Sequence, residues 1–283
     1  MRLTRHKDGA KALLRLDYGE QGLVYLDLFL KKEKTAKIII YDWYDYGTGL
    51  KYSDSVRQFV LLTAPDSSAL KQIFNIATGR KNKIKQIMAL IKAKQKGDYE
   101  RICSIYNSFD NELKQNKVLA LINLDAANTS GNRQVYARAL RSFETYFSND
   151  PTCSFMLIDH YFLEKNYVKA TQSIESFAAY IGIEDGGILS LKANVLLEQD
   201  RLKAASLVAE KGILIESGYE DNYWTALYCY TALEDYSNAT EICRKLESKF
   251  LYSLTMEVFQ EERFYQGLVQ SKPFMAWMNA KGN

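Results

Sequence analysis

The residues best suited to chemistry in this sequence are two aspartates that fall among aromatic residues near the N-terminus. Residues 41–46 place two carboxylates among four aromatic side chains. Asp42 is expected to share one face of a hairpin with Asp27 from the preceding strand-like run. Two carboxylates held close together in an apolar pocket raise the pKa of one of them and create an acid/base pair. The sequence therefore offers Asp27, Asp42 and Trp43 as a candidate enzymatic or small-molecule pocket.

A structural interpretation of the same segment competes with the chemical one. Asp42 and Asp45 would then be solvated residues at the end of a strand or in a turn, and Trp43 and the tyrosines would pack on neighbouring helices. No nucleophile with a base partner accompanies the carboxylates. Because aromatic-rich strands usually reflect packing, we favour this interpretation and expect no enzymatic activity.

The sequence contains few of the residues and motifs from which other catalytic, metal or cofactor sites are built. His6 and His160 are the two histidines, which excludes a site made of several histidines, and no glycine-rich phosphate-binding motif occurs. The cysteines contain no C-x-x-C pair and are expected to be buried packing residues rather than zinc ligands or disulfides. They are Cys103, Cys153, Cys229 and Cys243. No cofactor is expected.

Charge is distributed unevenly along the chain. Residues 2–96 contain 19 Lys/Arg against 9 Asp/Glu, whereas residues 180–262 contain 7 against 15. A lysine stripe in the basic part could attract nucleic acid or an anionic membrane surface. A solvated outer helix face is the competing interpretation, and we favour it because no aromatic residues interleave with the lysines. The stripe comprises Arg80, Lys81, Lys83, Lys85, Lys92, Lys94 and Lys96.

The elements that position the aspartates form a small α+β element over residues 1–78. Three runs rich in β-branched, leucine and aromatic residues predict an antiparallel sheet, over residues 12–18, 23–30 and 36–46. Both faces of the middle strand are mostly apolar, so we expect both to be covered. Ser53, Asp54 or Ser55 begins a helix that stops at Pro65, and a second helix is expected over residues 66–79. A curved sheet with helices on one face resembles part of the cone fold of the nuclear transport factor type.

The region from 79 to 250 carries a recurring signature, which is an aromatic residue or leucine followed three positions later by a small or aliphatic residue. Successive copies are 37, 31, 35 and 34 residues apart. A period near 34 predicts tandem helical hairpins that bury their apolar faces against one another. The copies are Tyr99 with Ile102, Tyr136 with Ala139, Tyr167 with Ala170, Leu202 with Ala205, and Tyr236 with Ala239.

These repeats resemble the tetratricopeptide repeat family. The family places a Gly-Asp/Asn-Tyr triplet at the turn between its two helices and an alanine three residues later. Residues 97–99, 165–167 and 234–236 look like that turn, and Asp150-Pro151 looks like the junction between repeats. Trp224 is similar to the aromatic residue that opens a repeat. The small residues suit the points where two helices cross closely.

The resemblance implies a mainly α fold, which is a superhelix of about five hairpins that follows the α+β element. Residues 251–283 would form capping helices, with Ser271 and Pro273 starting the last one. Covering the apolar end of the last repeat is a sufficient role for Phe274 and Trp277. The alternative role, an anchor for self-association, would require both side chains to be exposed.

The resemblance also implies that the first helix of each hairpin lines a concave groove that binds another protein or a peptide. Family members that grip a C-terminal carboxylate use a Lys/Asn/Arg clamp, which is not assembled here. We therefore expect a non-catalytic scaffold or adaptor for an extended or helical peptide. The groove positions counted from the crossing alanines and Trp224 are Phe155, Asp159, Phe162, Ser190, Asn194, Leu197, Thr225 and Cys229.

The composition is that of a globular chain, with 47% hydrophobic residues, 25% charged residues and a mean hydropathy of -0.28. No run of 18 apolar residues exists, so no membrane span is expected. The first residues lack the apolar stretch of a secretory leader, which favours a cytoplasmic location. Export stays open if residues upstream of Met1 are missing.

Overall fold

The computed structural model describes residues 2–7, 9–18, 22–63, 81–260 and 262–281. The second helix expected in the N-terminal element, over residues 66–79, lies outside these ranges. The chain divides into two compact units, Met1–His160 and Tyr161–Asn283. This division lies inside the repeat region, in a helix, and not at a junction expected from the sequence. Each unit is described by itself below.

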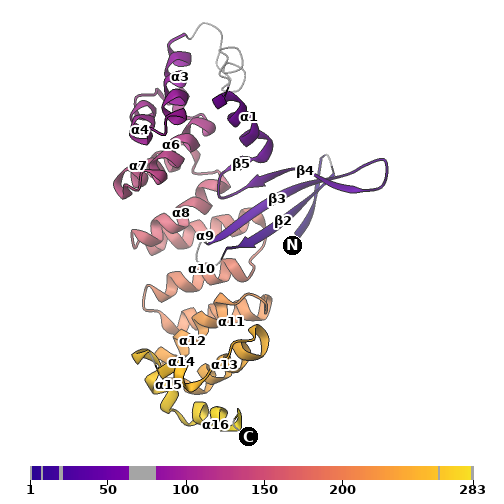
Figure 1. Ribbon diagram of the computed structural model, residues 1–283, viewed down its shortest axis with the longest axis vertical. Helices are drawn as coiled ribbons and strands as arrows, with labels where there is room; N and C mark the ends of the chain where they lie inside the picture. Colours follow the sequence, from indigo (N-terminus) through magenta and orange to yellow (C-terminus); the bar gives the residue numbers. More distant parts are fainter. Residues whose placement is uncertain (1, 8, 19–21, 64–80, 261, 282–283) are drawn as a thin grey trace. The chain divides into compact units, whose positions relative to one another are not determined.

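The N-terminal sheet is an antiparallel meander whose strands follow one another in sequence order (Figure 1). The three predicted strands are present, and two short edge strands accompany them in the described residues. Ala10 of the second strand pairs with Leu30 of the third. The loop between the third and fourth strands therefore lies at the same end of the sheet as the turn between the first and second strands. The strands are β1 Arg2–His6, β2 Gly9–Asp17, β3 Leu23–Lys32, β4 Ile38–Asp45 and β5 Leu50–Lys51.

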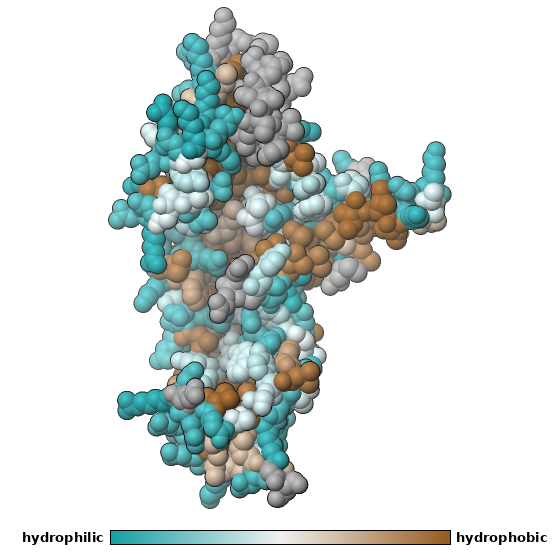
Figure 2. Space-filling model, in the orientation of Figure 1, coloured by the Kyte–Doolittle hydropathy of each residue, from teal (hydrophilic) through white to brown (hydrophobic). Residues whose placement is uncertain are grey.

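The two faces of the sheet differ in burial. Tyr25 and Phe29 of β3 are buried on one face. On the other face the leucines of β3 are only half-buried, and Leu3, Ile38 and Ile40 are 61%, 73% and 54% exposed. Figure 2 shows apolar residues gathered along the sheet and hydrophilic ones at the end of the β3–β4 hairpin. The expectation that both faces are covered is therefore wrong for the described residues, and the resemblance to the nuclear transport factor cone is not confirmed.

Helix α1, Tyr52–Thr63, follows the sheet directly and begins one residue earlier than the first predicted capping residue. The described part of the chain then contains five sequential pairs of helices, which confirms the mainly α fold with repeated hairpins. The pairs are α3 Lys81–Gln95 with α4 Tyr99–Asn107, α6 Lys117–Thr129 with α7 Arg133–Phe147, α8 Pro151–Leu163 with α9 Tyr167–Ile181, α10 Gly186–Leu197 with α11 Leu202–Ile215, and α12 Asp221–Ala232 with α13 Tyr236–Phe250. A short helix, α5 Asn111–Lys114, separates α4 from α6 and explains the longest repeat spacing.

The turn between paired helices has the same backbone conformation and hydrogen bonding in four of these hairpins. One residue takes the left-handed conformation, with φ of 65° at Gly97, 56° at Lys165 and 57° at Glu234. The next residue donates its N–H back to the preceding helix, as Asn166 does to the Tyr161 carbonyl at 2.8 Å. In three of the four hairpins the side chain of that residue also caps the second helix, as Asn166 Oδ1 does by accepting from the Lys169 N–H, whereas Arg201 makes no such bond. One residue thus closes the first helix and opens the second.

The signature residues lie where the repeat interpretation requires them. Tyr99, Tyr167, Leu202 and Tyr236 are each the first residue of a second helix. The small residues three positions later are buried, with Ala170, Ala205 and Ala239 at 0% exposure and Ala139 at 6%. A methyl group at these crossing points lets two helix backbones approach closely. The repeated helical hairpins expected from the sequence are therefore present, in their turns as well as in their period.

The C-terminal segment covers the end of the second unit. It comprises α14 Met256–Gln260, the 3₁₀ turn η2 Arg263–Tyr265, α15 Gln266–Gln270 and α16 Lys272–Lys281. Ser271 Oγ accepts from the Phe274 N–H at 3.4 Å, as expected for the residue that caps the last helix. Phe274 and Trp277 are 0% and 7% exposed and belong to the core shared with α12 and α13. Their burial favours the capping role and excludes an exposed anchor for self-association.

Candidate functional site

Asp27, the first member of the candidate N-terminal pocket, is a buried structural carboxylate. It is 5% exposed, and its Oδ2 accepts from Lys11 Nζ at 2.8 Å and from the Tyr46 hydroxyl at 2.6 Å. Lys11 lies on β2 and Tyr46 directly follows β4. The carboxylate therefore joins three consecutive parts of the sheet, and a buried charge in this arrangement is compensated by its partners.

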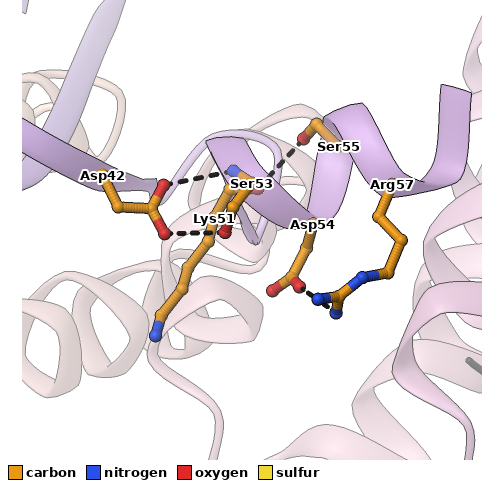
Figure 3. A network of polar contacts seen from close by, with 6 residues as sticks. All are labelled: Asp42, Lys51, Ser53, Asp54, Ser55 and Arg57. Atoms are coloured by element: carbon orange, nitrogen blue, oxygen red, sulfur yellow. Dashed lines mark hydrogen bonds and ion pairs between the residues drawn. The ribbon is translucent and has the colours of Figure 1, made fainter. Parts of the chain in front are cut away.

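Asp42 is the residue that anchors helix α1 to the sheet (Figure 3). Its Oδ1 accepts from the Ser53 N–H at 3.1 Å and its Oδ2 accepts from the Ser53 hydroxyl at 2.7 Å. A carboxylate at this position satisfies free N–H groups of the first helical turn and interacts favourably with the helix dipole. The sequence suggested a cap from within residues 53–55, whereas the structure supplies a carboxylate from a strand 11 positions earlier.

The three residues of the candidate N-terminal pocket do not converge on one site. The strand register places Asp27 opposite Tyr44 and Asp42 opposite Phe29, so the two carboxylates share a face as expected. Their hydrogen-bond partners differ, and none in the described part of the chain joins one carboxylate to the other. Trp43 pairs with Leu28 on the opposite face and stacks on Tyr52, with ring centroids 4.1 Å apart. This geometry favours structural roles for all three residues.

The first unit contains an open cleft that is lined mostly by the first helices of its hairpins, with Tyr136 from the second helix α7 and Ser55 from α1. Its volume is about 300 Å³, and it lies between α6, α3, α8 and the turn that joins β4 to β5. Leu121 and Met156 supply apolar surface, whereas Asn128 supplies a polar group. Lys94 and Asp125 form an ion pair at 3.2 Å in its lining. The cleft thus combines apolar and polar groups on the first helices of hairpins.

Asp159, a member of the groove set expected from the sequence, does not line the cleft, but its charge acts on Tyr136, which does. Its side chain is exposed, yet desolvation by the surrounding protein raises its pKa. Burial raises the pKa of Tyr136, which lines the cleft, and the charge of Asp159 raises it further. A carboxylate that water reaches but that protein atoms crowd is the state expected on a concave surface. In the described residues, Asp159 makes no hydrogen bond or ion pair.

Phe155 is the other residue of the expected groove set in the first unit. Its side chain is half-buried and already packs against another part of the chain. Its ring packs edge-on against Tyr25 of β3, with centroids 5.8 Å apart. This contact places the sheet against α8 within the first unit. Phe155 therefore contributes to docking the N-terminal sheet on α8, the first helix of the third hairpin.

The remaining groove positions lie in the second unit and divide into two groups. Ser190, Thr225 and Cys229 are buried at 3%, 8% and 0% exposure. Asn194 and Leu197 are half-exposed, and Asn194 Oδ1 lies 3.5 Å from the Thr225 hydroxyl. The sixth residue of the set in this unit is Phe162, which is half-exposed and contacts Tyr167 edge-on. The accessible members of the groove set in the second unit are therefore Phe162, Asn194 and Leu197.

Aromatic residues of α12 that the groove count missed are accessible in the second unit. Tyr228 is 43% exposed and stacks on Phe264 of η2, with centroids 4.6 Å apart. Trp224 Nε1 donates to Glu220 at 2.6 Å, and the Trp224 ring contacts Tyr252 edge-on. Tyr228 differs from the predicted Cys229 by one position, which is a rotation of about 100° on a helix. The chain's own C-terminal segment covers part of this face.

The lysine stripe is partly neutralised within the first unit. Lys83 Nζ lies 2.6 Å from Asp110 and 2.8 Å from Glu112, and Lys94 pairs with Asp125. Arg80 lies outside the described residues. These ion pairs favour the interpretation of the stripe as a solvated face.

The cysteines and His160 behave as packing residues. All four cysteines are buried and free, and burial raises the pKa of the Cys153 and Cys243 thiols to about 12. His160 is 6% exposed. No three metal-ligating side chains gather in the part of the chain that the structure describes. None of the described helices has both the length and the apolar surface to cross a bilayer.

Comparison with solved structures finds helical-repeat proteins. A MamA protein is similar over 63% of this chain and 98% of its own, at 17% identity and a TM-score of 0.46. YrrB, a TPR protein with an unusual peptide-binding site, is similar over 60% of this chain and 94% of its own, at 13% identity and a TM-score of 0.40. No protein-family model matches the chain. No curated protein matches it either.

Proposed function

We propose that this chain is a non-catalytic scaffold that binds a peptide segment of another protein on the inner surface of its helical hairpins. The observation that carries the proposal is the open cleft of the first unit with its mixed lining, together with the Asp159 carboxylate, whose charge acts on the lining residue Tyr136. An extended peptide can place one side chain in a cleft of about 300 Å³ and neighbouring groups along the helices.

The charges around the cleft define the kind of peptide that fits it. Lys94 and Asp125 neutralise each other, whereas Asp159 makes no ion pair in the described residues. A crowded carboxylate gains free energy from a cationic partner, because the partner replaces lost solvation. The peptide is therefore expected to carry a lysine or arginine close to an apolar residue, which would contact Leu121 and Met156.

The experiment is a selection of random displayed peptides on the purified full chain, followed by affinity measurements on the enriched peptides. Asp159→Asn removes the charge with little change of shape, and Glu175→Gln makes the same change on the exposed face of α9. We expect peptides with a basic residue to be enriched and to lose about tenfold in affinity with Asp159→Asn but not with Glu175→Gln. Failure to enrich any peptide, or equal binding by both variants, would reject the proposed site.

A further inference from the structure

A second hollow in the first unit lies between α4 and α7, on the second helices of two consecutive hairpins. Its volume is about 500 Å³, within the range of small-molecule sites. Both α4 and α7 pack on α6, which forms the floor between them. Helix α4 has 9 residues, whereas α7 has 15, and Ile102 replaces the crossing alanine of the later repeats.

The floor of the hollow contains a polar side chain that the protein leaves without a partner. Asn123 of α6 is 4% exposed and lines the hollow beside the buried Cys103 and Ala139. Its side-chain amide forms no hydrogen bond with any residue that the structure describes. Asn222 Oδ1 and Thr231 Oγ1 are the fully buried side-chain atoms without a partner in the described residues, so the Asn123 amide still faces the open hollow. An amide at the bottom of an open hollow is suited to contact a ligand.

The rim of the hollow carries one cation and one anion that do not neutralise each other. Arg138 of α7 and Glu100 of α4 both line it. Neither makes an ion pair or a side-chain hydrogen bond within the described ranges, so both keep their full capacity for a ligand. Asn107, also on α4, adds a second side-chain amide that makes no hydrogen bond within the described ranges. Opposite charges at two places on one rim match a molecule that carries both an ammonium and a carboxylate group.

We propose that the hollow between α4 and α7 binds a small zwitterion, either a free amino acid or a short peptide with free ends. Arg138 would bind the carboxylate, Glu100 the ammonium group, and Asn123 the polar groups that reach the floor. Cys103 and Ala139 leave space there because they are small. This site shares no lining residue with the peptide cleft, and either one can exist without the other.

The test measures binding of three probes to the full chain by titration calorimetry and by thermal unfolding. The probes are L-glutamine, the dipeptide Ala-Ala with free ends, and the same dipeptide acetylated at its N-terminus and amidated at its C-terminus. We expect at least one zwitterion to bind and to raise the unfolding temperature, whereas the blocked dipeptide does neither. Binding of glutamine alone identifies an amino-acid site, and binding of the dipeptide alone identifies a peptide-end site.

Two variants assign the binding to the hollow. Arg138→Gln should weaken binding about tenfold or more, because a charge-assisted contact is lost. Arg101→Gln removes the same charge from α4 at an exposed position outside the hollow and should leave binding unchanged. Both are surface substitutions, so unchanged circular dichroism would verify that the fold is kept. Absence of zwitterion binding at millimolar concentration, equal binding of the blocked dipeptide, or unchanged binding by Arg138→Gln would each overturn the proposal.

Discussion

Gly212 sits at the closest approach between α11 and α12, and its replacement by alanine tests how these hairpins stack. A β-carbon at this position would lie 2.4 Å from Asn222 Nδ2 and 2.5 Å from Asn222 Cγ. Asn222 is fully buried, and its Nδ2 donates to the Gly186 carbonyl of α10 at 2.9 Å. The added methyl group would therefore displace a side chain that links three successive helices.

The expected magnitude follows from three contributions. Overpacking costs about 2 kcal/mol, and loss of the buried hydrogen bond costs about 1 kcal/mol more. Replacing glycine by alanine inside a helix contributes about 1 kcal/mol in the opposite direction. Gly212→Ala should therefore lower the free energy of unfolding by about 2 kcal/mol, which is a large part of the stability of a small unit.

Asn222→Ala supplies the matched background. The three nearest atoms to the added β-carbon all belong to the Asn222 side chain, and this substitution removes them. In that background Gly212→Ala should stabilise the protein by about 1 kcal/mol, because only the helix preference remains. The assay is urea unfolding of the four proteins, followed by circular dichroism and tryptophan fluorescence. A destabilisation of the same size in both backgrounds would refute the packing argument.

Four further outcomes follow from particular residues. Lys165→Gly should raise the free energy of unfolding by about 1 kcal/mol in urea, because glycine relieves the left-handed backbone at φ of 56°; a loss of stability would contradict this. Asp159→Asn should stabilise the protein at pH 7, since the raised native pKa disfavours the charged form, and the gain should vanish as pH falls below the unfolded pKa of about 3.9 in thermal scans. Cys243 should resist iodoacetamide at pH 8 until the protein unfolds, because burial raises its thiol pKa to about 12. Phe274→Ala should cost about 3 to 4 kcal/mol in the same urea assay, and a cost below about 1 kcal/mol would show that the cap is dispensable.

The candidate site was only partly predictable. Counting back from Ala205 located the half-exposed Asn194, because helical periodicity is fixed by the backbone. The same kind of count gave Cys229 in place of Tyr228, since one residue of error turns a side chain from the surface into the core. The hollow between α4 and α7 was not predicted, because it depends on how two second helices pack on α6.

The sequence by itself determined the period, the hairpins and their turns. These features are local, because left-handed residues, capping side chains such as Asn166 and small residues such as Ala205 act within a few positions of the chain. The tertiary structure alone decided which carboxylates became structural. Asp42 caps α1 from 11 positions away, and Asp27 meets Lys11 only through the strand register. Partners of that kind depend on register and packing across elements, which no short pattern in a sequence records.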